Sequence, residues 1–146
     1  IMQHIAPLGN VYQAGTLSGN PIAMIAGYTI LKELKSKPSI YKELEEKTIY
    51  LKDGLNQAFR AWGQPYVINQ FGSMISVHFN DHPVIDFASA SSANNELFKR
   101  YFHAMLSRGI YLPPSSFESW FLNNALTKED LDKTIEATKE SLNELQ

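Results

Sequence analysis

The chain has 146 residues, 44% of them hydrophobic and 19% charged, and a formal net charge of −2. This length allows one domain with its own core, or part of a larger protein. Acidic and basic residues are interspersed, which argues against a nucleic-acid partner because no basic face can form.

Cysteine is absent from the sequence, which excludes disulfides and thiolate metal sites. No apolar run reaches the roughly 18 residues that cross a bilayer, so we expect no membrane partner and a cytoplasmic location. The sequence begins "IMQHIAPLG", in mid-pattern and without an initiator methionine, which suggests a missing upstream part.

Two helices are predicted before residue 63. The first begins at Pro21 behind an Asn20 cap and ends at Pro38, because proline suits the first helical position and cannot continue a helix. Helical spacing predicts a buried stripe on it: Ile22, Ile25, Ala26, Ile30 and Leu34. The second helix starts with a Ser39 cap and stops at Gly63. Its apolar positions are Ile40, Leu44, Leu51, Leu55, Ala58 and Phe59.

Two strands follow, "PYVINQF" and "SMISVHF", on either side of Gly72. Strand alternation places Ile75, Val77 and Phe79 on one face. Met74, Ser76 and His78 take the opposite face. Residues 80–94 show no periodicity and are predicted to form a mobile loop.

The last third of the chain predicts helix, strand, strand, helix. Asn94 caps a helix that stops at Gly109, and "IYL" reads as a short strand ended by two prolines. "SSFESWFLNNAL" reads as a loop entering another strand. A Thr127 to Asp130 capping box opens the final helix, with Leu131, Ile135, Leu142 and Leu145 expected inside. The mixed pattern predicts an α+β fold.

The stretch "YQAGTLSGNP" leads directly into the first helix and permits two interpretations. Gly15 and Gly19 let the backbone turn sharply, and free N–H groups with the hydroxyls of Thr16 and Ser18 suit a phosphate. Alternatively, these residues only cap the helix. No metal is expected, because the predicted strand-to-loop context and Pro83 deny His78 and His82 the helical face that a four-residue metal pair needs.

Several stretches together resemble a known family. "PLGNVYQAGTLSGNPIAMIAG", "VINQFGSMISVHF" and "ELFKRYFHAMLSRGIYLPPSSFESWF" are similar to segments of class-III pyridoxal-phosphate aminotransferases, and within them most similar to the glutamate-1-semialdehyde 2,1-aminomutase family. The resemblance implies the C-terminal part of the aspartate-aminotransferase-like fold, with a small antiparallel sheet packed with helices. Residues 1–36 would end the large cofactor domain and 37–146 would form the small domain.

The resemblance also implies a cofactor and a partner. The cofactor is pyridoxal 5'-phosphate, alternating with pyridoxamine 5'-phosphate, and Gly15 and Thr16 match the motif that holds its phosphate. In the family this threonine reaches the cofactor of the neighbouring subunit, which implies a homodimer. The lysine that forms the Schiff base precedes Ile1 in the family, so no catalytic residue is assigned here and the chain alone is expected to be inactive.

Glu118 is the substrate-binding candidate. Related aminotransferases place an arginine in this region, whereas the aminomutases resemble this chain in having a glutamate, which suits the amine or aldehyde of a small-molecule substrate. The alternative is an ordinary solvent-exposed loop acid. Trp120 and Leu126 depart from the family pattern.

The implied function is conversion of glutamate 1-semialdehyde to 5-aminolevulinate in tetrapyrrole biosynthesis. A conventional transaminase and a non-catalytic dimerisation domain remain alternatives.

Overall fold

The computed structural model describes residues 1–145, which divide into two compact units, residues 1–38 and a second unit that begins at Ser39. Each unit is considered by itself. The assignment of the first segment to a larger cofactor domain stays a prediction.

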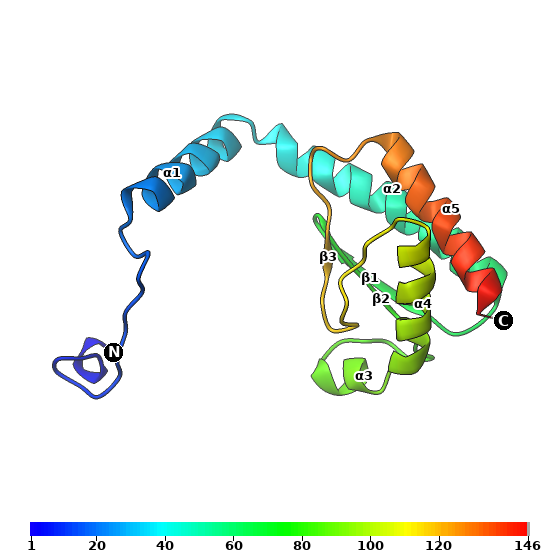
Figure 1. The fold of residues 1–146 in the computed structure, drawn as a ribbon, viewed down its shortest axis with the longest axis horizontal. Helices are drawn as coiled ribbons and strands as arrows, with labels where there is room; N and C mark the ends of the chain where they lie inside the picture. Colours follow the sequence, from blue (N-terminus) through cyan, green and yellow to red (C-terminus); the bar gives the residue numbers. More distant parts are fainter. Residues whose placement is uncertain (146) are drawn as a thin grey trace. The chain divides into compact units, whose positions relative to one another are not determined.

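The first unit contains a short 3-10 helix, η1 (Met2–His4), and helix α1 (Pro21–Ser36; Figure 1). Pro21 and the Asn20 cap open α1 as predicted. The predicted buried stripe is wrong within the described chain, because no residue of α1 is buried and Ile22, Ile25 and Ile30 are 78%, 59% and 56% exposed. An apolar stripe on a helix is buried only when another element packs against it, and this unit contains no second long element that could do so.

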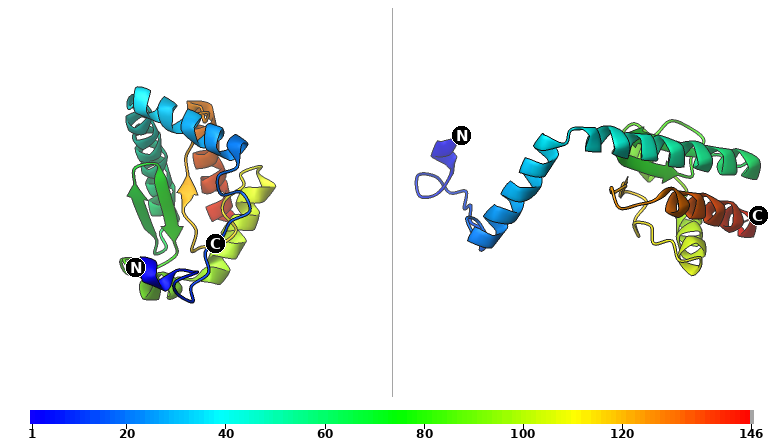
Figure 2. Two further views of the ribbon diagram at one scale, coloured as in Figure 1. Left: turned by 90° about the vertical axis from the view of Figure 1, so that its left-hand side faces the viewer. Right: turned by 90° about the horizontal axis from the view of Figure 1, so that it is seen from above.

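The second unit is an α+β fold. Helix α2 (Ser39–Trp62) leads into strands β1 (Val67–Phe71) and β2 (Met74–His78), and after helices α3 (Phe87–Ser91) and α4 (Asn95–Ser107) come strand β3 (Trp120–Phe121) and helix α5 (Lys128–Glu144). The antiparallel sheet has the order β1-β2-β3, with Ile68 opposite Val77 and Ile75 opposite Trp120. Helices α2 and α5 lie side by side (Figure 2).

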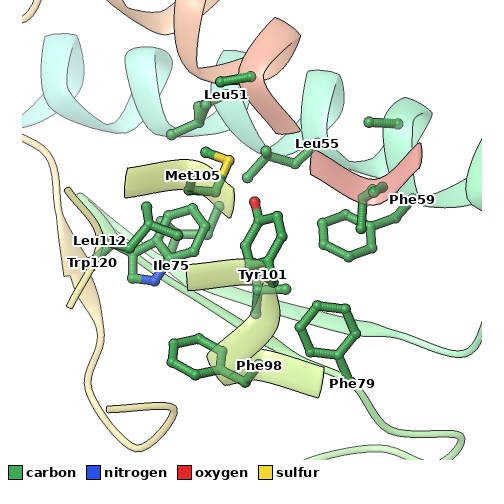
Figure 3. Close-up of a cluster of buried hydrophobic side chains, with 14 of the residues drawn as sticks. Leu51, Leu55, Phe59, Ile75, Phe79, Phe98, Tyr101, Met105, Leu112 and Trp120 are labelled. Carbon is green, nitrogen blue, oxygen red and sulfur yellow. The ribbon is translucent and has the colours of Figure 1, made fainter. Parts of the chain in front are cut away.

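The core lies between this sheet and the helices. Ile75 and Val77 of β2 are 1% exposed, which confirms the predicted inward face, and they join Leu55, Phe59 and other apolar side chains of α2. Tyr101 of α4 is fully buried at the centre of this cluster (Figure 3). Burial of aromatic rings of this size dominates the stability of such a core.

Most predicted helix ends are confirmed. Gly63 and Gly109 follow α2 and α4 with φ of +78°, a conformation that costs glycine little. Asn94 accepts a hydrogen bond from the Leu97 N–H, and Thr127 and Asp130 form the capping box of α5.

One loop prediction and one strand prediction are wrong. Residues 87–91 form helix α3 because Asp86 and Ser89 make a reciprocal capping box, a signal overlooked in the sequence. Residues 110–112 are not a strand: the Ile110 N–H donates to the Met105 carbonyl at the end of α4, and the prolines that follow have no N–H for a ladder.

Candidate functional site

The stretch before α1 is a chain of tight turns. The Ser18 N–H donates to the Gly15 carbonyl at 2.9 Å, and the Asn20 N–H to the Leu17 carbonyl at 3.0 Å. Asn20 Oδ1 accepts from the N–H groups of Ile22 and Ala23 at 3.0 and 3.2 Å. The capping interpretation is therefore correct for Asn20, and two amides of the first helical turn are already occupied.

Any anion site here must consequently lie in the turn that precedes the cap. Thr16 is exposed, and among the described residues neither its hydroxyl nor its N–H has a hydrogen-bond partner. A Cβ added to Gly15 would lie 2.5 Å from Ser18 Oγ, so a side chain at that position would require the Ser18 hydroxyl to move. An unpaired hydroxyl beside an unpaired amide suits a phosphate oxygen, so these two residues fit the implied group.

Glu118 lies in the second unit and lines a cavity of about 580 Å³. Two stretches form its wall, residues 111–114 after α4 and residues 118–121 at the start of β3. The Glu118 side chain is exposed and makes no hydrogen bond or ion pair with residues 1–145. A carboxylate with no partner at a cavity is free to meet a cationic ligand.

Hydrogen bonds hold the segment that carries Glu118. The Glu118 N–H donates to the Ser115 carbonyl at 3.1 Å, and buried Ser116 donates its hydroxyl to Asn95 Oδ1 at 2.6 Å. Beyond β3, the Leu122 N–H donates to the Ser73 carbonyl at 3.0 Å. The carboxylate is thus exposed on a segment whose ends are fixed to α4 and to the β-hairpin.

The two departures from the family pattern occupy different places. Trp120 lines the cavity and is also 6% exposed within the core. Leu126 is outside the cavity wall: it packs against the core, and its carbonyl accepts from Lys47 Nζ at 2.7 Å. Of the two, Trp120 is the residue that lines the cavity.

A second cavity, of about 270 Å³, lies beside the first. We call it the His78 cavity, and its wall consists of Ser76, His78, Val84, Asp86, Phe87, Ala90, Ser116, Phe117, Glu118 and Ser119. Strand alternation places Ser76 and His78 on one face, but it does not predict the cavity, because α3 lies within residues 80–94, which are predicted to form a loop. The Asp86 to Ser89 spacing was the signal that could have found it.

The histidines do not form a metal site among the described residues. His78 Nε2 lies 3.2 Å from Ser76 Oγ, whereas His82 Nδ1 lies 2.7 Å from Asp81 Oδ1. Within residues 1–145, no cluster of three or more histidine or carboxylate side chains could hold an ion. Nor does any described helix combine the length and apolarity needed to cross a membrane.

Known proteins match almost the whole chain. The sequence model of the class-III aminotransferase family matches residues 1–142. A glutamate-1-semialdehyde 2,1-aminomutase of Flavobacterium johnsoniae is 54% identical over 94% of this chain and 32% of its own length. One from Thermus thermophilus is 50% identical over 97% of this chain and 33% of its own length.

The fold matches solved structures as well. An omega-transaminase from Sphaerobacter thermophilus is superimposable with a TM-score of 0.75 at 21% identity, over 99% of this chain and 33% of that one. The predicted α+β fold of a pyridoxal-phosphate transferase is thereby confirmed. The chain spans about a third of the length of the curated relatives it matches. It belongs to the class-III aminotransferase family.

Proposed function

We propose that this chain is the C-terminal part of a glutamate-1-semialdehyde 2,1-aminomutase, which converts glutamate 1-semialdehyde to 5-aminolevulinate in tetrapyrrole biosynthesis. The observation that carries the proposal is identity of 54% and 50% to two proteins of that name, over nearly the whole chain. Because the chain spans a third of their length, the activity is proposed for the complete protein that contains it.

Gly15 and Thr16 are proposed to hold the phosphate of pyridoxal 5'-phosphate. The support is the unpaired Thr16 hydroxyl and N–H, in a turn where Gly15 carries no side chain that could obstruct a ligand. When bound, this cofactor supplies the electron sink and the exchangeable amino group of the reaction. By resemblance the phosphate belongs to the neighbouring subunit, so the proposal includes a homodimer. A cytoplasmic location is proposed with it.

Glu118 is proposed to orient the substrate. A carboxylate in the wall of the larger cavity pairs with a protonated amino group through a charge-assisted hydrogen bond. It repels a substrate that carries a carboxylate at the same position, which is the group that the arginine of ordinary aminotransferases selects. Trp120, in the same wall, limits the width available to the substrate.

The lysine that forms the Schiff base is assigned outside this chain. Lys32 and Lys35 lie on α1, downstream of the proposed phosphate turn, and Lys37 follows the helix and pairs with Glu33 at 2.5 Å. None of them occupies the position that the family uses, before Ile1. The role left to this chain is to hold the phosphate and orient the substrate.

Product formation by the complete protein tests the function. Glutamate 1-semialdehyde is supplied without an amino donor or oxoacid, and 5-aminolevulinate is measured. Conversion is the expected result, since an aminomutase keeps the amino group within one substrate. Activity that appears only with an external donor and oxoacid would overturn the proposal in favour of a conventional transaminase.

Two substitutions test the assigned residues. Thr16→Val should weaken cofactor retention by about 1.5–3 kcal/mol, the value of a hydrogen bond to a charged group. Thr29→Val is the matched control, because the Thr29 hydroxyl only donates to the Ile25 carbonyl within α1. Glu118→Gln should lower kcat/KM by about tenfold or more while exposed Glu45→Gln leaves it unchanged. Equal effects of test and control variants would remove the residue from the site.

A further inference from the structure

We propose that Ser116 is a positioning residue: through its hydrogen bond to Asn95 it fixes the turn that presents the Glu118 carboxylate at the cavity of about 580 Å³. This proposal rests on the proposed function, in which Glu118 orients the substrate. It adds that the first turn of α4, which is not part of the cavity wall, determines where the carboxylate lies.

Ser116 is the buried residue of the segment that carries Glu118. Among residues 113–119, all of which the structure describes, only Ser116 is buried, at 8% exposed. Its hydroxyl donates to Asn95 Oδ1 at 2.6 Å, and this is the only side-chain hydrogen bond that joins the segment to another element of the described chain. The attachment of the segment to the second unit therefore depends mainly on this bond.

The other contact of the segment is exposed to water. The ring of Phe117 lies 5.6 Å from that of Phe87 in α3 between centroids, but the two residues are 51% and 76% exposed. Apolar contacts stabilise in proportion to the area that they remove from water. This pair is therefore less able to hold the turn than the buried hydrogen bond of Ser116.

The acceptor of that bond lies on a fixed backbone. Asn95 is the first residue of α4. Before it, Asn94 accepts from the Leu97 N–H at 3.0 Å and donates its own N–H to the Phe79 carbonyl at 2.9 Å. After it, Phe98 lies in the core at 3% exposed. The backbone of Asn95 is thus held on both sides, so its side chain offers a constant position to the Ser116 hydroxyl.

Two further hydrogen bonds close the turn around Ser116. The Glu118 N–H donates to the Ser115 carbonyl at 3.1 Å, and the Phe117 N–H donates to Ser115 Oγ at 3.2 Å. They fix the backbone between Ser115 and Glu118, so the position of Ser116 also determines where the Glu118 side chain begins. This matters for catalysis, because a misplacement of about 1 Å can cost about a hundredfold in rate.

Kinetics of the complete, cofactor-loaded protein test the coupling of Ser116 to Glu118. Ser116→Ala should lower kcat/KM for glutamate 1-semialdehyde by about three- to tenfold, the loss expected for one neutral hydrogen bond. In a Glu118→Ala background the same substitution should change kcat/KM by less than about twofold, because a positioning residue acts only through the group that it positions. Equal losses in the two backgrounds would overturn the proposal, since a general loss of structure does not depend on the carboxylate.

Two more variants separate the bond from ordinary packing. Asn95→Ala removes the acceptor and should reproduce the loss, and the double variant with Ser116→Ala should lose no more than about twofold beyond the larger single loss. Ser141→Ala is the matched control, because Ser141 is fully buried in α5 and its hydroxyl has no partner within residues 1–145. It should leave kcat/KM unchanged. Additive losses in the double variant, or a loss in the control, contradict the proposal.

Hydrogen exchange distinguishes failure of this proposal from failure of the proposed function, because it needs no activity. In Ser116→Ala the amides of residues 115–119 should exchange about threefold faster or more than in the parent and in Ser141→Ala, since the turn opens more often. Unchanged exchange would overturn the proposal even if the protein forms 5-aminolevulinate. Faster exchange in a protein that forms none would support the role of the Ser116–Asn95 bond and overturn only the proposed function.

Discussion

A buried hydroxyl pair joins helices α4 and α5 in the core of the second unit. The Tyr101 hydroxyl lies 2.9 Å from Thr138 Oγ1, and both residues are 0% exposed. Thr138 Oγ1 donates its single proton to the Thr134 carbonyl at 2.9 Å, so the Tyr101 hydroxyl is the donor to Thr138. Burial raises the pKa of Tyr101, which keeps the phenol neutral.

The two partners of this pair should not cost the same when removed. Thr138→Val leaves the Tyr101 hydroxyl buried without a partner, which should lower the free energy of unfolding by about 1–3 kcal/mol. Tyr101→Phe leaves Thr138 bonded to Thr134 and should cost about 0.5–1.5 kcal/mol. The double variant buries no orphaned hydroxyl, so its loss should fall short of the sum by at least about 1 kcal/mol.

Urea unfolding followed by tryptophan fluorescence measures these differences. Both tryptophans, Trp62 and Trp120, lie in the core of the second unit, so the signal reports that unit alone. Thr48→Val is the control partner for Tyr101→Phe, because fully buried Thr48 bonds only to the Leu44 carbonyl among the described residues. That pair should be additive. Additivity within about 0.5 kcal/mol for Tyr101 and Thr138 as well would refute the reasoning.

Three further predictions concern the same unit. Gly54→Ala should destabilise this unit by about 1 kcal/mol, because the new Cβ would lie 2.6 Å from Ile135 Cγ1. In an Ile135→Ala background the same substitution should be stabilising, because only the higher helix propensity of alanine remains. The same sign in both backgrounds would contradict this prediction. The free energy of unfolding should fall as the pH drops from 7.5 to 5, because burial lowers the pKa of His78 in the folded state below 6.5, so the unfolded chain binds more protons. His78→Phe should flatten this pH dependence. An unchanged slope in that variant would exclude His78 as its cause. Arg108→Met should reduce stability at low salt, because the guanidinium donates to Glu140 Oε2 at 2.9 Å and also bonds Glu144. The difference in unfolding free energy from the parent should narrow in 1 M salt, because salt screens the ion pairs. A difference independent of salt would assign the loss to packing.

The sequence alone determined the elements whose signals are local. Helix ends at Gly63 and Gly109, the caps at Asn20 and Asn94, and the capping box at Thr127 depend on hydrogen bonds within a few residues, so their patterns are readable without a fold. The inward face of β2 follows equally from strict alternation along the strand.

Tertiary structure decided which predicted elements pack against one another. The stripe on α1 was read correctly as helical, yet it is exposed because burial needs a partner element that a local pattern cannot supply. Residues 110–112 form no strand, because a strand needs a neighbouring strand and free N–H groups with which to make inter-strand hydrogen bonds.

The candidate sites divide in the same way. Gly15 and Thr16 are adjacent in the sequence, so the proposal that they hold a phosphate rests on a local motif. The His78 cavity combines residues of β2, α3 and the segment before β3, which are far apart in the chain and meet only in the folded unit. Local hydrogen bonding fixes the turns and caps, whereas cavities are fixed by contacts between residues far apart in the chain.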